Sequence, residues 1–231
     1  MTGTSSGIGA AVAKNLLSSG WHVVGIARRS VALGENYAHL ALDLADLAAA
    51  VPAIERDVGK RLGERAWQRI GLVNNAAVGL AGRFQNLDAA KLARSFVVNS
   101  AMPLWLMGFV ARRRPADAQL RIVNISSGAA VRAFPGLSAY CSSKAALHMA
   151  GMAVAAEETP GVAVFSYQPG VVDTEMQVAT RSHSREEFPW VDTFHRFHDE
   201  GMLAPPELPA ADIVKFLEAE GAQGFSEGRR S

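Results

Sequence analysis

A tyrosine and a lysine four positions apart are the residues best placed to do chemistry. Tyr140 and Lys144 lie in SAYCSSKAALHMAGMAVAAEE, where Ser138 as N-cap, the following alanines and a stop at Thr159-Pro160-Gly161 predict a helix. Residues i and i+4 share a helix face, so we expect the phenol beside the ammonium. A nearby, partly buried cation can contribute the roughly 4 kcal/mol that brings a tyrosine pKa from ~10 to neutrality. On this pair alone, a half-exposed tyrosine and a solvated lysine stay an open alternative.

Two more polar residues and a glycine-rich turn accompany this pair. Ser127 follows LRIVNISS, an apolar run typical of a buried strand, and the carboxyl ends of strands are where open α/β sheets bind ligands. Asn99 stands within a helical pattern, RSFVVNSAMPLWLMGFVARR, where a polar amide needs a partner. Near the start, TGTSSGIG places Gly3, Gly7 and Gly9 before a helical segment, and such a turn lets backbone amides approach a pyrophosphate. The spacing GxxxGxG differs from the GxGxxG dinucleotide fingerprint and is weak evidence by itself.

Together these motifs resemble the short-chain dehydrogenase/reductase family. The matches run in family order from Thr2 to Met176: TGTSSGIG, the DL of LALDLAD, NNAA, the Asn of VVNS, the Ser of NISS, YCSSK and PGVVDTEM. The resemblance implies an α/β fold, a single Rossmann-like domain over residues 1–231 with a doubly wound parallel sheet. It implies a catalytic set of Asn99, Ser127, Tyr140 and Lys144. It also implies a nicotinamide cofactor held by Gly3, Ser5, Ser6, Gly7, Ile8, Arg28, Arg29, Asp43, Leu44, Asn75, Ala76, Tyr140, Lys144, Pro169, Gly170, Val172 and Thr174.

The resemblance further implies that hydride passes from the cofactor to a carbonyl carbon. Tyr140 would donate the proton as general acid, and Ser127 would hydrogen-bond the carbonyl oxygen. Lys144 would lower the pKa of the tyrosine and hold the nicotinamide ribose, and Asn99 would hold a water that relays protons to the lysine. The same residues permit a secondary-alcohol dehydrogenase running in reverse. An alternative outside the enzymes is a non-catalytic, NADP-binding sensor that has kept the fold of the family.

The choice between NADP and NAD is predicted from the strand WHVVGIA. It ends in Arg28 and Arg29, with no acidic residue to hold the ribose 2′-hydroxyl of NAD. Arginine accommodates the 2′-phosphate of NADP, so we expect NADPH, although two solvated surface arginines are the alternative. The NNAA motif departs from the family pattern NNAG at Ala77, a change of one methyl that we expect to be tolerated.

The substrate is less constrained than the cofactor. The runs SSGAAVRAFPGLSAYCSSKAALHM and PGVVDTEMQ look most like benzil reductases and sepiapterin reductases, which reduce adjacent dicarbonyls. No acidic residue in EGAQGFSEGRRS clearly matches the pterin anchor of sepiapterin reductases. A bulky 1,2-dicarbonyl or aryl ketone is therefore expected, with 3-oxoacyl groups as the alternative.

Bulk composition narrows the possible partners. A net charge of +1 argues against nucleic acid or an anionic membrane as partner. One cysteine, Cys141, excludes a disulfide framework and a cysteine zinc cluster. No apolar run reaches ~18 residues and the N-terminus does not read as a signal peptide, so a soluble cytoplasmic enzyme is expected. Family members commonly form homodimers or homotetramers, and we expect one of these here.

The N-terminus departs from the family pattern. Only Met1 and Thr2 precede the glycine turn, where the family has a central apolar strand. Four buried apolar side chains at roughly 2 kcal/mol each contribute about 8 kcal/mol, against a whole-domain stability of about 5–15 kcal/mol. We therefore expect the sheet to lack its first central strand and the native polypeptide to start upstream.

The remaining elements follow from apolar periodicity and glycine or proline stops. Residues 177–201 are expected to form a mobile segment over the substrate, with His183, His195 and His198 as solvated side chains rather than metal ligands. The expected strands are Trp21–Ala27, His39–Leu42, Arg69–Val73, Val162–Gln168 and Ala222–Ser226, and the further helices are Ala10–Ser19, Leu44–Leu62, Asn99–Arg113 and Pro209–Glu220.

Overall fold

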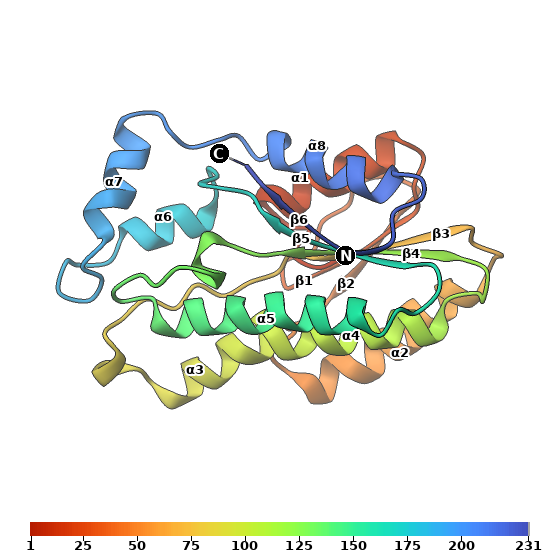
Figure 1. Ribbon diagram of the computed structural model, residues 1–231, viewed down its shortest axis with the longest axis horizontal. Coiled ribbons are helices and arrows are strands. Elements are labelled where there is room, and N and C mark those ends of the chain that lie inside the picture. The colour runs from red at the N-terminus through yellow and green to blue at the C-terminus, as the bar shows by residue number, and fades with distance from the viewer. Residues whose placement is uncertain (231) are drawn as a thin grey trace.

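Helices cover both faces of a parallel sheet in the computed structural model, which describes residues 1–230 (Figure 1). The helices are α1 (Gly7–Ser18), α2 (Leu47–Gly63), α3 (Ala89–Phe96), α4 (Met102–Arg113), α5 (Ser138–Ala156), α6 (Glu175–Arg181), α7 (Val191–Asp199) and α8 (Glu207–Glu218). The strands are β1 (Val23–Ala27), β2 (Tyr37–Ala41), β3 (Arg69–Asn74), β4 (Gln119–Ile125), β5 (Val162–Gln168) and β6 (Gly224–Arg229). Helices α1 and α8 lie on one side of the sheet, and α2, α4 and α5 lie on the other.

The sheet is divided into two parts. Strands β1 and β2 form one parallel pair, and β3, β4, β5 and β6 form a four-stranded parallel sheet in that order. Thr2 and Gly3 join the two parts of the sheet. Thr2 N–H donates to Val73 O of β3 at 3.0 Å, and Gly3 N–H donates to Ile26 O of β1 at 2.8 Å. The Rossmann-like α/β fold without its first central strand, predicted from the sequence, is confirmed.

Strand β4 runs through the centre of the core, and its sequence explains why. A strand that is buried on both faces reads as a continuous apolar run, and LRIVNI is such a run. Leu120 and Ile122 face the cluster under α2 and α4, whereas Val123 and Ile125 face the cluster under α1 and α8. The carboxyl end of β4 is thereby held rigidly where Ser127 follows.

Several predicted boundaries need correction. Leu137, not Ser138, is the N-cap residue of α5, since Ser138 already has helical geometry. Helix α1 begins at Gly7 rather than at residue 10, because the glycine turn leads straight into it. The predicted helix Asn99–Arg113 instead starts with a π-helical turn, Val97–Ala101, before α4. The segment 177–201 contains most of α6 and all of α7, and its expected mobility over the substrate stays a prediction.

Candidate active site

The carboxyl end of β4 and the first turns of α5 bring three of the predicted catalytic side chains together. The Ser127 hydroxyl accepts a hydrogen bond from Ala129 N–H at 3.2 Å and lies against the half-buried phenol of Tyr140. One turn along α5, the Lys144 ammonium lies 5.7 Å from the centroid of the Tyr140 ring. The i, i+4 spacing therefore places phenol and cation on one face, as predicted.

The pKa of Tyr140 departs from its ordinary value in the direction opposite to the sequence-based expectation. Burial raises the pKa of the phenol to about 12, and a hydrogen bond with Ser127 offsets only part of that rise. The expected lowering of this pKa by Lys144 is not seen; the ammonium lies 5.7 Å from the ring centroid and donates a hydrogen bond to Ile125 O. The phenol consequently keeps its proton throughout the neutral pH range.

Lys144 is buried more deeply than the tyrosine. Its side chain is 2% exposed, and Nζ donates a hydrogen bond to Ile125 O, at the end of β4, at 2.7 Å. Burial lowers the pKa of the ammonium to about 8. The lysine therefore ties α5 to β4 and stays largely protonated at neutral pH.

Asn99 lies in the π-helical turn and is fully engaged by its surroundings. Its Oδ1 accepts a hydrogen bond from Val78 N–H at 2.7 Å, and its Nδ2 donates to Val78 O at 2.9 Å and to Ser143 Oγ at 3.0 Å. Asn99 thus fastens the loop after β3 to α5, one residue from Lys144. The amide of Asn99 thus has the partners that its place in a helical pattern requires. Its role in holding a water for a proton relay stays a prediction.

The glycine turn and the NNAA loop form one unit at the N-terminus of α1. Asn75 Nδ2 donates to Thr2 O and to Gly3 O, each at 3.1 Å. A Cβ at Gly3 would lie 2.5 Å from Asn75 Nδ2, and Gly7 adopts φ +55°, so both positions require glycine. Ser6, the N-cap residue of α1, makes no side-chain capping bond, which leaves the first amides of α1 for an anion. This cradle fits the pyrophosphate of a dinucleotide.

One residue of this unit, Thr2, was missed by the sequence reasoning as a site residue. Thr2 Oγ1 accepts hydrogen bonds from the amides of Asn75 and Ala76, each at 3.0 Å. A Cβ at Gly9 would meet Gly3 O at 2.1 Å, so Gly9 lets the turn close against the helix. The threonine of the TG pair and the third glycine of the motif were the sequence signals for these two contacts.

Two ion pairs link the predicted adenosine-side residues to other segments. Arg29 Nη2 donates to Glu175 Oε2 at 2.8 Å, and Ser6 Oγ donates to the same oxygen at 3.4 Å. Arg94 donates to both carboxylate oxygens of Asp43, at 3.1 and 2.7 Å. Burial raises the pKa of Asp43, but hydrogen bonds from the Ala45 amide and from Arg94 outweigh it, so this pKa lies below its ordinary value.

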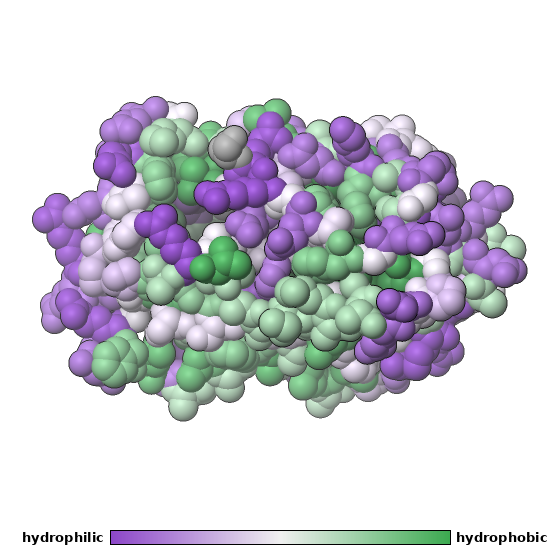
Figure 2. Space-filling view, viewed as in Figure 1, coloured by the Kyte–Doolittle hydropathy of each residue, from purple (hydrophilic) through white to green (hydrophobic). Residues whose placement is uncertain are grey.

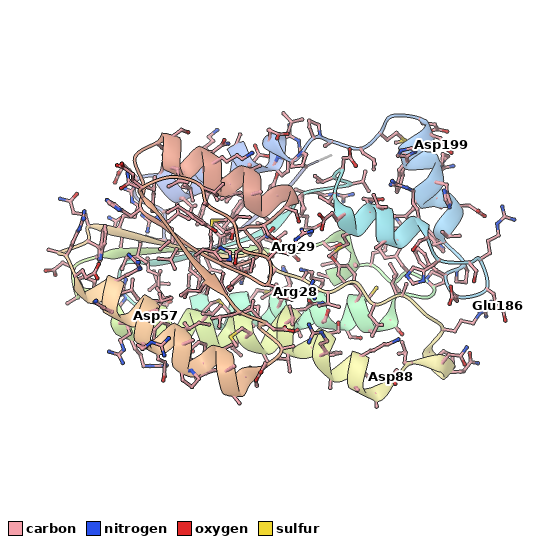
Figure 3. The ribbon with its side chains drawn as sticks, turned by 180° about the vertical axis from the view of Figure 1, so that it is seen from behind. Arg28, Arg29, Asp57, Asp88, Glu186 and Asp199 are labelled. Atoms are coloured by element: carbon pink, nitrogen blue, oxygen red, sulfur yellow. The ribbon has the colours of Figure 1, made fainter. Side chains whose placement is uncertain are left out.

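The two adjacent arginines after β1 are exposed (Figure 3). Arg28 contributes electrostatically to the low pKa of Asp43, so both charged groups lie in one neighbourhood. Leu44, by contrast, is 6% exposed and packs in the core under α2. Only the backbone of Leu44 is therefore available for the predicted contact with the cofactor.

The predicted nicotinamide-side residues follow β5. Pro169 is buried, and Gly170 turns the chain at φ +75°. Val172 forms an isolated parallel bridge with Ala204, and Thr174 caps α6. A Cβ at Gly7 would lie 3.0 Å from Thr174 Cγ2, so the start of α6 packs against the start of α1. Both halves of the predicted cofactor set therefore meet at the carboxyl edge of the sheet.

An aromatic and cationic cluster, missed by the sequence reasoning, lies close along the chain to the predicted catalytic residues. The rings of Phe134 and Trp190 meet edge to face with centroids 5.2 Å apart. The Arg132 guanidinium lies 5.4 Å from the first ring centroid and 5.8 Å from the second. Cys141, next to Tyr140, donates through Sγ to Arg132 O at 3.8 Å. This cluster fastens the segment before α7 onto the loop that joins Ser127 to Tyr140.

Within residues 1–230, no group of three or more histidine, cysteine, aspartate or glutamate side chains is placed to hold a metal ion. Two of the predicted solvated histidines lie near carboxylates: His183 is 3.6 Å from Glu187, and His198, in α7, is 3.0 Å from Asp199. In the same part of the chain, no helix has both the length and the apolar character that crossing a bilayer requires.

Comparison with known proteins gives the class of protein that this fold and site define. A family profile described as short chain dehydrogenase matches residues 1–185. The chain belongs to the short-chain dehydrogenase family, whose members are oxidoreductases that bind a nicotinamide cofactor.

Individual relatives resemble the chain over nearly its whole length. A benzil reductase ((S)-benzoin forming) of Bacillus subtilis (strain 168) is 32% identical, covering 99% of this chain and 95% of that protein. The benzil reductase of Bacillus cereus is also 32% identical, over 95% of this chain and 93% of that protein. A solved short chain dehydrogenase/reductase of Saccharomyces cerevisiae is 26% identical with a TM-score of 0.81, covering 98% of this chain and 93% of that one.

Proposed function

We propose that the protein is an NADPH-dependent carbonyl reductase that transfers hydride to a ketone or a 1,2-dicarbonyl. The observation that carries the proposal is the half-buried phenol of Tyr140 against the Ser127 hydroxyl, with the Lys144 ammonium on the same helix face. The nicotinamide ring, when bound, supplies the hydride. The protein must supply a proton and stabilise charge on the carbonyl oxygen.

The roles of the side chains follow from their protonation and position. Tyr140, with a pKa of about 12, holds a proton to give to the developing alkoxide and is poorly suited to act as a base. Ser127 lies beside that phenol and hydrogen-bonds the same oxygen. Lys144 holds positive charge on the same helix face as the phenol and returns protons to the tyrosine by way of a water held near Asn99. These assignments favour reduction over oxidation of a secondary alcohol at neutral pH.

The preference for NADPH rests on charge at the end of β1. Arg28 and Arg29 are exposed there and no carboxylate follows the strand in sequence, so a 2′-phosphate meets two cations. The carboxylate that does reach Arg29 comes from Glu175, on α6. A 2′-phosphate would compete with this carboxylate for the guanidinium.

The proposed substrate class rests on the aromatic cluster and on two relatives. The names of the Bacillus relatives describe reduction of benzil, an aromatic 1,2-diketone, to (S)-benzoin. Here Phe134 and Arg132 lie on the loop that follows Ser127, and Trp190 lies just before α7; together they offer aromatic faces and a cation. A bulky aryl dicarbonyl fits these faces better than a 3-oxoacyl chain does.

An assay panel tests the proposal. Oxidation of NADPH and of NADH is followed at 340 nm with benzil, an aliphatic 1,2-diketone, an aryl ketone and a 3-oxoacyl ester. Benzil with NADPH should give the highest kcat/KM. Thermal stabilisation by NADPH without turnover of any carbonyl would instead indicate a cofactor sensor, and equal rates with NADH would contradict the role of the two arginines.

We also propose that the protein assembles as a homodimer or homotetramer in the cytoplasm. Helices α4 and α5 expose Leu104, Met149 and Met152, and apolar side chains gather on the face that α5 presents (Figure 2). Exposed apolar patches of this kind are typical of protein interfaces. Light scattering on the purified protein would give the mass of the assembly.

A further inference from the structure

The backbone of Arg132 is fixed between the two predicted catalytic residues Ser127 and Tyr140. Its N–H donates to the carbonyl oxygen of Gly128, the residue after Ser127, at 3.0 Å. Its own carbonyl oxygen accepts from Sγ of Cys141, the residue after Tyr140, at 3.8 Å. These two contacts hold Arg132 beside the carboxyl end of β4 and the first turn of α5, where a bound substrate would meet the phenol.

Two aromatic rings hold the Arg132 side chain. Its guanidinium lies 5.4 Å from the Phe134 ring centroid and 5.8 Å from the Trp190 ring centroid. The platform is supported from below, because a Cβ on Gly136 would lie 3.0 Å from Cδ2 of the fully buried Phe188. A guanidinium that stacks on aromatic faces keeps its in-plane N–H groups available for hydrogen bonds.

Within residues 1–230, the guanidinium of Arg132 contacts the two rings and has neither a hydrogen bond nor an ion pair. The carboxylates nearest in sequence to Trp190 have other partners. Glu187 accepts from Ser184 N–H at 3.1 Å, and Asp192 pairs with Arg185 at 2.9 Å. The arginines that pair with a carboxylate in this part of the chain are Arg29, Arg56, Arg69, Arg94, Arg185 and Arg230.

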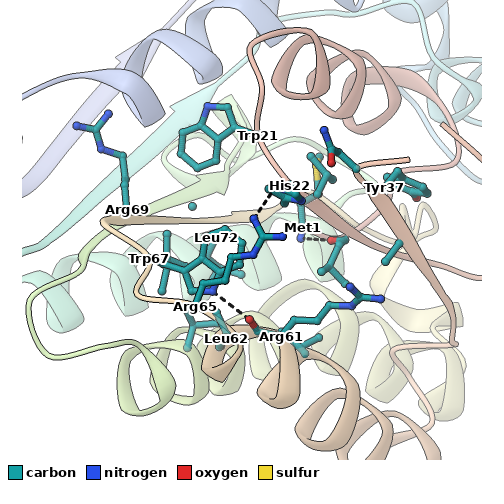
Figure 4. Close-up of a pocket in the computed structure, with 18 of the residues that line it drawn as sticks. Met1, Trp21, His22, Tyr37, Arg61, Leu62, Arg65, Trp67, Arg69 and Leu72 are labelled. Carbon is teal, nitrogen blue, oxygen red and sulfur yellow. Dashed lines mark hydrogen bonds between the residues drawn. The ribbon is translucent and has the colours of Figure 1, made fainter. Parts of the chain in front are cut away.

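Arg65 provides a contrast at the other end of the sheet. It also stacks on an aromatic ring, with its guanidinium 5.3 Å from the Trp67 centroid, but one of its nitrogens lies 3.2 Å from His22 Nε2 (Figure 4). The exposed guanidinium of Arg132 has the ring contacts without such a polar partner. It is therefore held in place with its N–H donors available to a ligand.

The ligand that suits these donors is a carboxylate. A guanidinium binds a carboxylate through two parallel, charge-assisted hydrogen bonds, and the neighbouring rings suit an aryl group. In a 1,2-dicarbonyl, the second carbonyl carbon is bonded directly to the carbon that receives hydride. A carboxylate in that place carries a negative charge that opposes the growth of charge on the adjacent oxygen. A cation beside the carboxylate offsets this repulsion.

We propose that the protein also reduces aryl 2-oxo acids, such as phenylglyoxylate, and that Arg132 binds their carboxylate. The proposal rests on the proposed function, because Tyr140 and Ser127 act on the 2-oxo group as they do on a diketone. Hydride from the reduced nicotinamide dinucleotide adds to the 2-oxo carbon, and the electron pair of the C=O π bond takes the proton of Tyr140. The products are the 2-hydroxy acid and the oxidised dinucleotide, and the carboxylate is unchanged.

Phenylglyoxylate and its methyl ester test the role of charge, because they differ only at the carboxyl group. The measurement is kcat/KM for each at saturating NADPH, in wild type and in Arg132→Met, which keeps an apolar stem without the guanidinium. The variant should lower kcat/KM for the acid about 10- to 100-fold and for the ester at most about threefold. An equal loss for acid and ester would overturn the proposal.

Two further variants serve as references. Arg132→Lys keeps the charge but not the bidentate fork, so its loss for the acid should lie between wild type and Arg132→Met. Arg65→Met removes an exposed guanidinium from an aromatic ring at the opposite edge of the sheet, and the ratio of kcat/KM between acid and ester should stay as in wild type. A fall in that ratio as large as the one in Arg132→Met would overturn the proposal.

A binding measurement separates failure of this proposal from failure of the proposed function. Calorimetry in the presence of NADP⁺, which has no hydride to donate, gives the Kd for phenylglyoxylate without turnover. Arg132→Met should raise this Kd at least about tenfold. Reduction of benzil and of the methyl ester, with no binding of the acid to wild type at ~10 mM, would overturn the role of Arg132 and leave the proposed reductase standing. If NADPH reduces no carbonyl at all, the proposed function fails and this proposal fails with it.

Discussion

Replacing Lys144 by methionine should stabilise the protein at pH 7, and this stabilisation should disappear at high pH. Burial lowers the pKa of this lysine from 10.5 to about 8, which corresponds to about 3 kcal/mol of destabilisation while the group is charged in both states. The unfolded chain binds more protons between pH 8 and 10.5, so wild-type stability rises through that window. The methionine variant lacks this rise. It also leaves Ile125 O without its donor, at a cost of about 1–3 kcal/mol.

Denaturant unfolding at several pH values measures this effect. The difference in unfolding free energy between Lys144→Met and wild type should fall by about 2–3 kcal/mol from pH 7 to pH 10. Lys215→Met, at an exposed position of α8, should show no such change. A difference that stays constant within about 0.5 kcal/mol across this range would refute the buried-ammonium argument. The Lys144 variant should in either case lose reductase activity.

Three further changes test the site. Tyr140→Phe should lower kcat by roughly 10²–10⁴ while the Kd for NADPH stays unchanged, and full turnover would contradict the role of general acid. Glu175→Gln frees Arg29 from an exposed ion pair that contributes at most about 1 kcal/mol. The variant should therefore bind NADPH up to about fivefold more tightly and bind NADH unchanged. An equal effect on both cofactors would argue against a 2′-phosphate site. Arg132→Ala removes a cation from two aromatic faces and should raise KM for benzil about three- to tenfold, whereas a change in NADPH affinity instead would place Arg132 on the cofactor side.

The sequence was sufficient to predict the order of the strands and the shared helix face of Tyr140 and Lys144. Apolar runs and glycine stops are local signals, and β5 has the predicted limits Val162–Gln168. The i, i+4 spacing on α5 is also local, so it placed Lys144 on the same face as the phenol. Local patterns of this kind survive folding because they are properties of a single element.

Burial and long-range pairing could not be predicted in the same way. The pKa of Tyr140 depends on how much of the fold covers it, and spacing on one helix carries no information about that cover. The pairs Arg29–Glu175 and Arg94–Asp43 join segments far apart in the chain, and charged surface residues have no periodicity that reveals a partner. Helices α6 and α7 were missed because their polar residues resemble those of a loop.

The π-helical turn Val97–Ala101 sets the rotational phase between α3 and α4. Met102 N–H bonds Val97 O, one residue further back than in an α-helix, so the turn holds one extra residue. Each residue of an α-helix advances the side chains by about 100°, so closing this turn by one deletion would swing α3 by that angle relative to α4. From within this wider turn, Asn99 reaches both Val78 and Ser143. Deleting a single residue here would therefore disconnect the loop after β3 from α5, although it removes no residue of either segment.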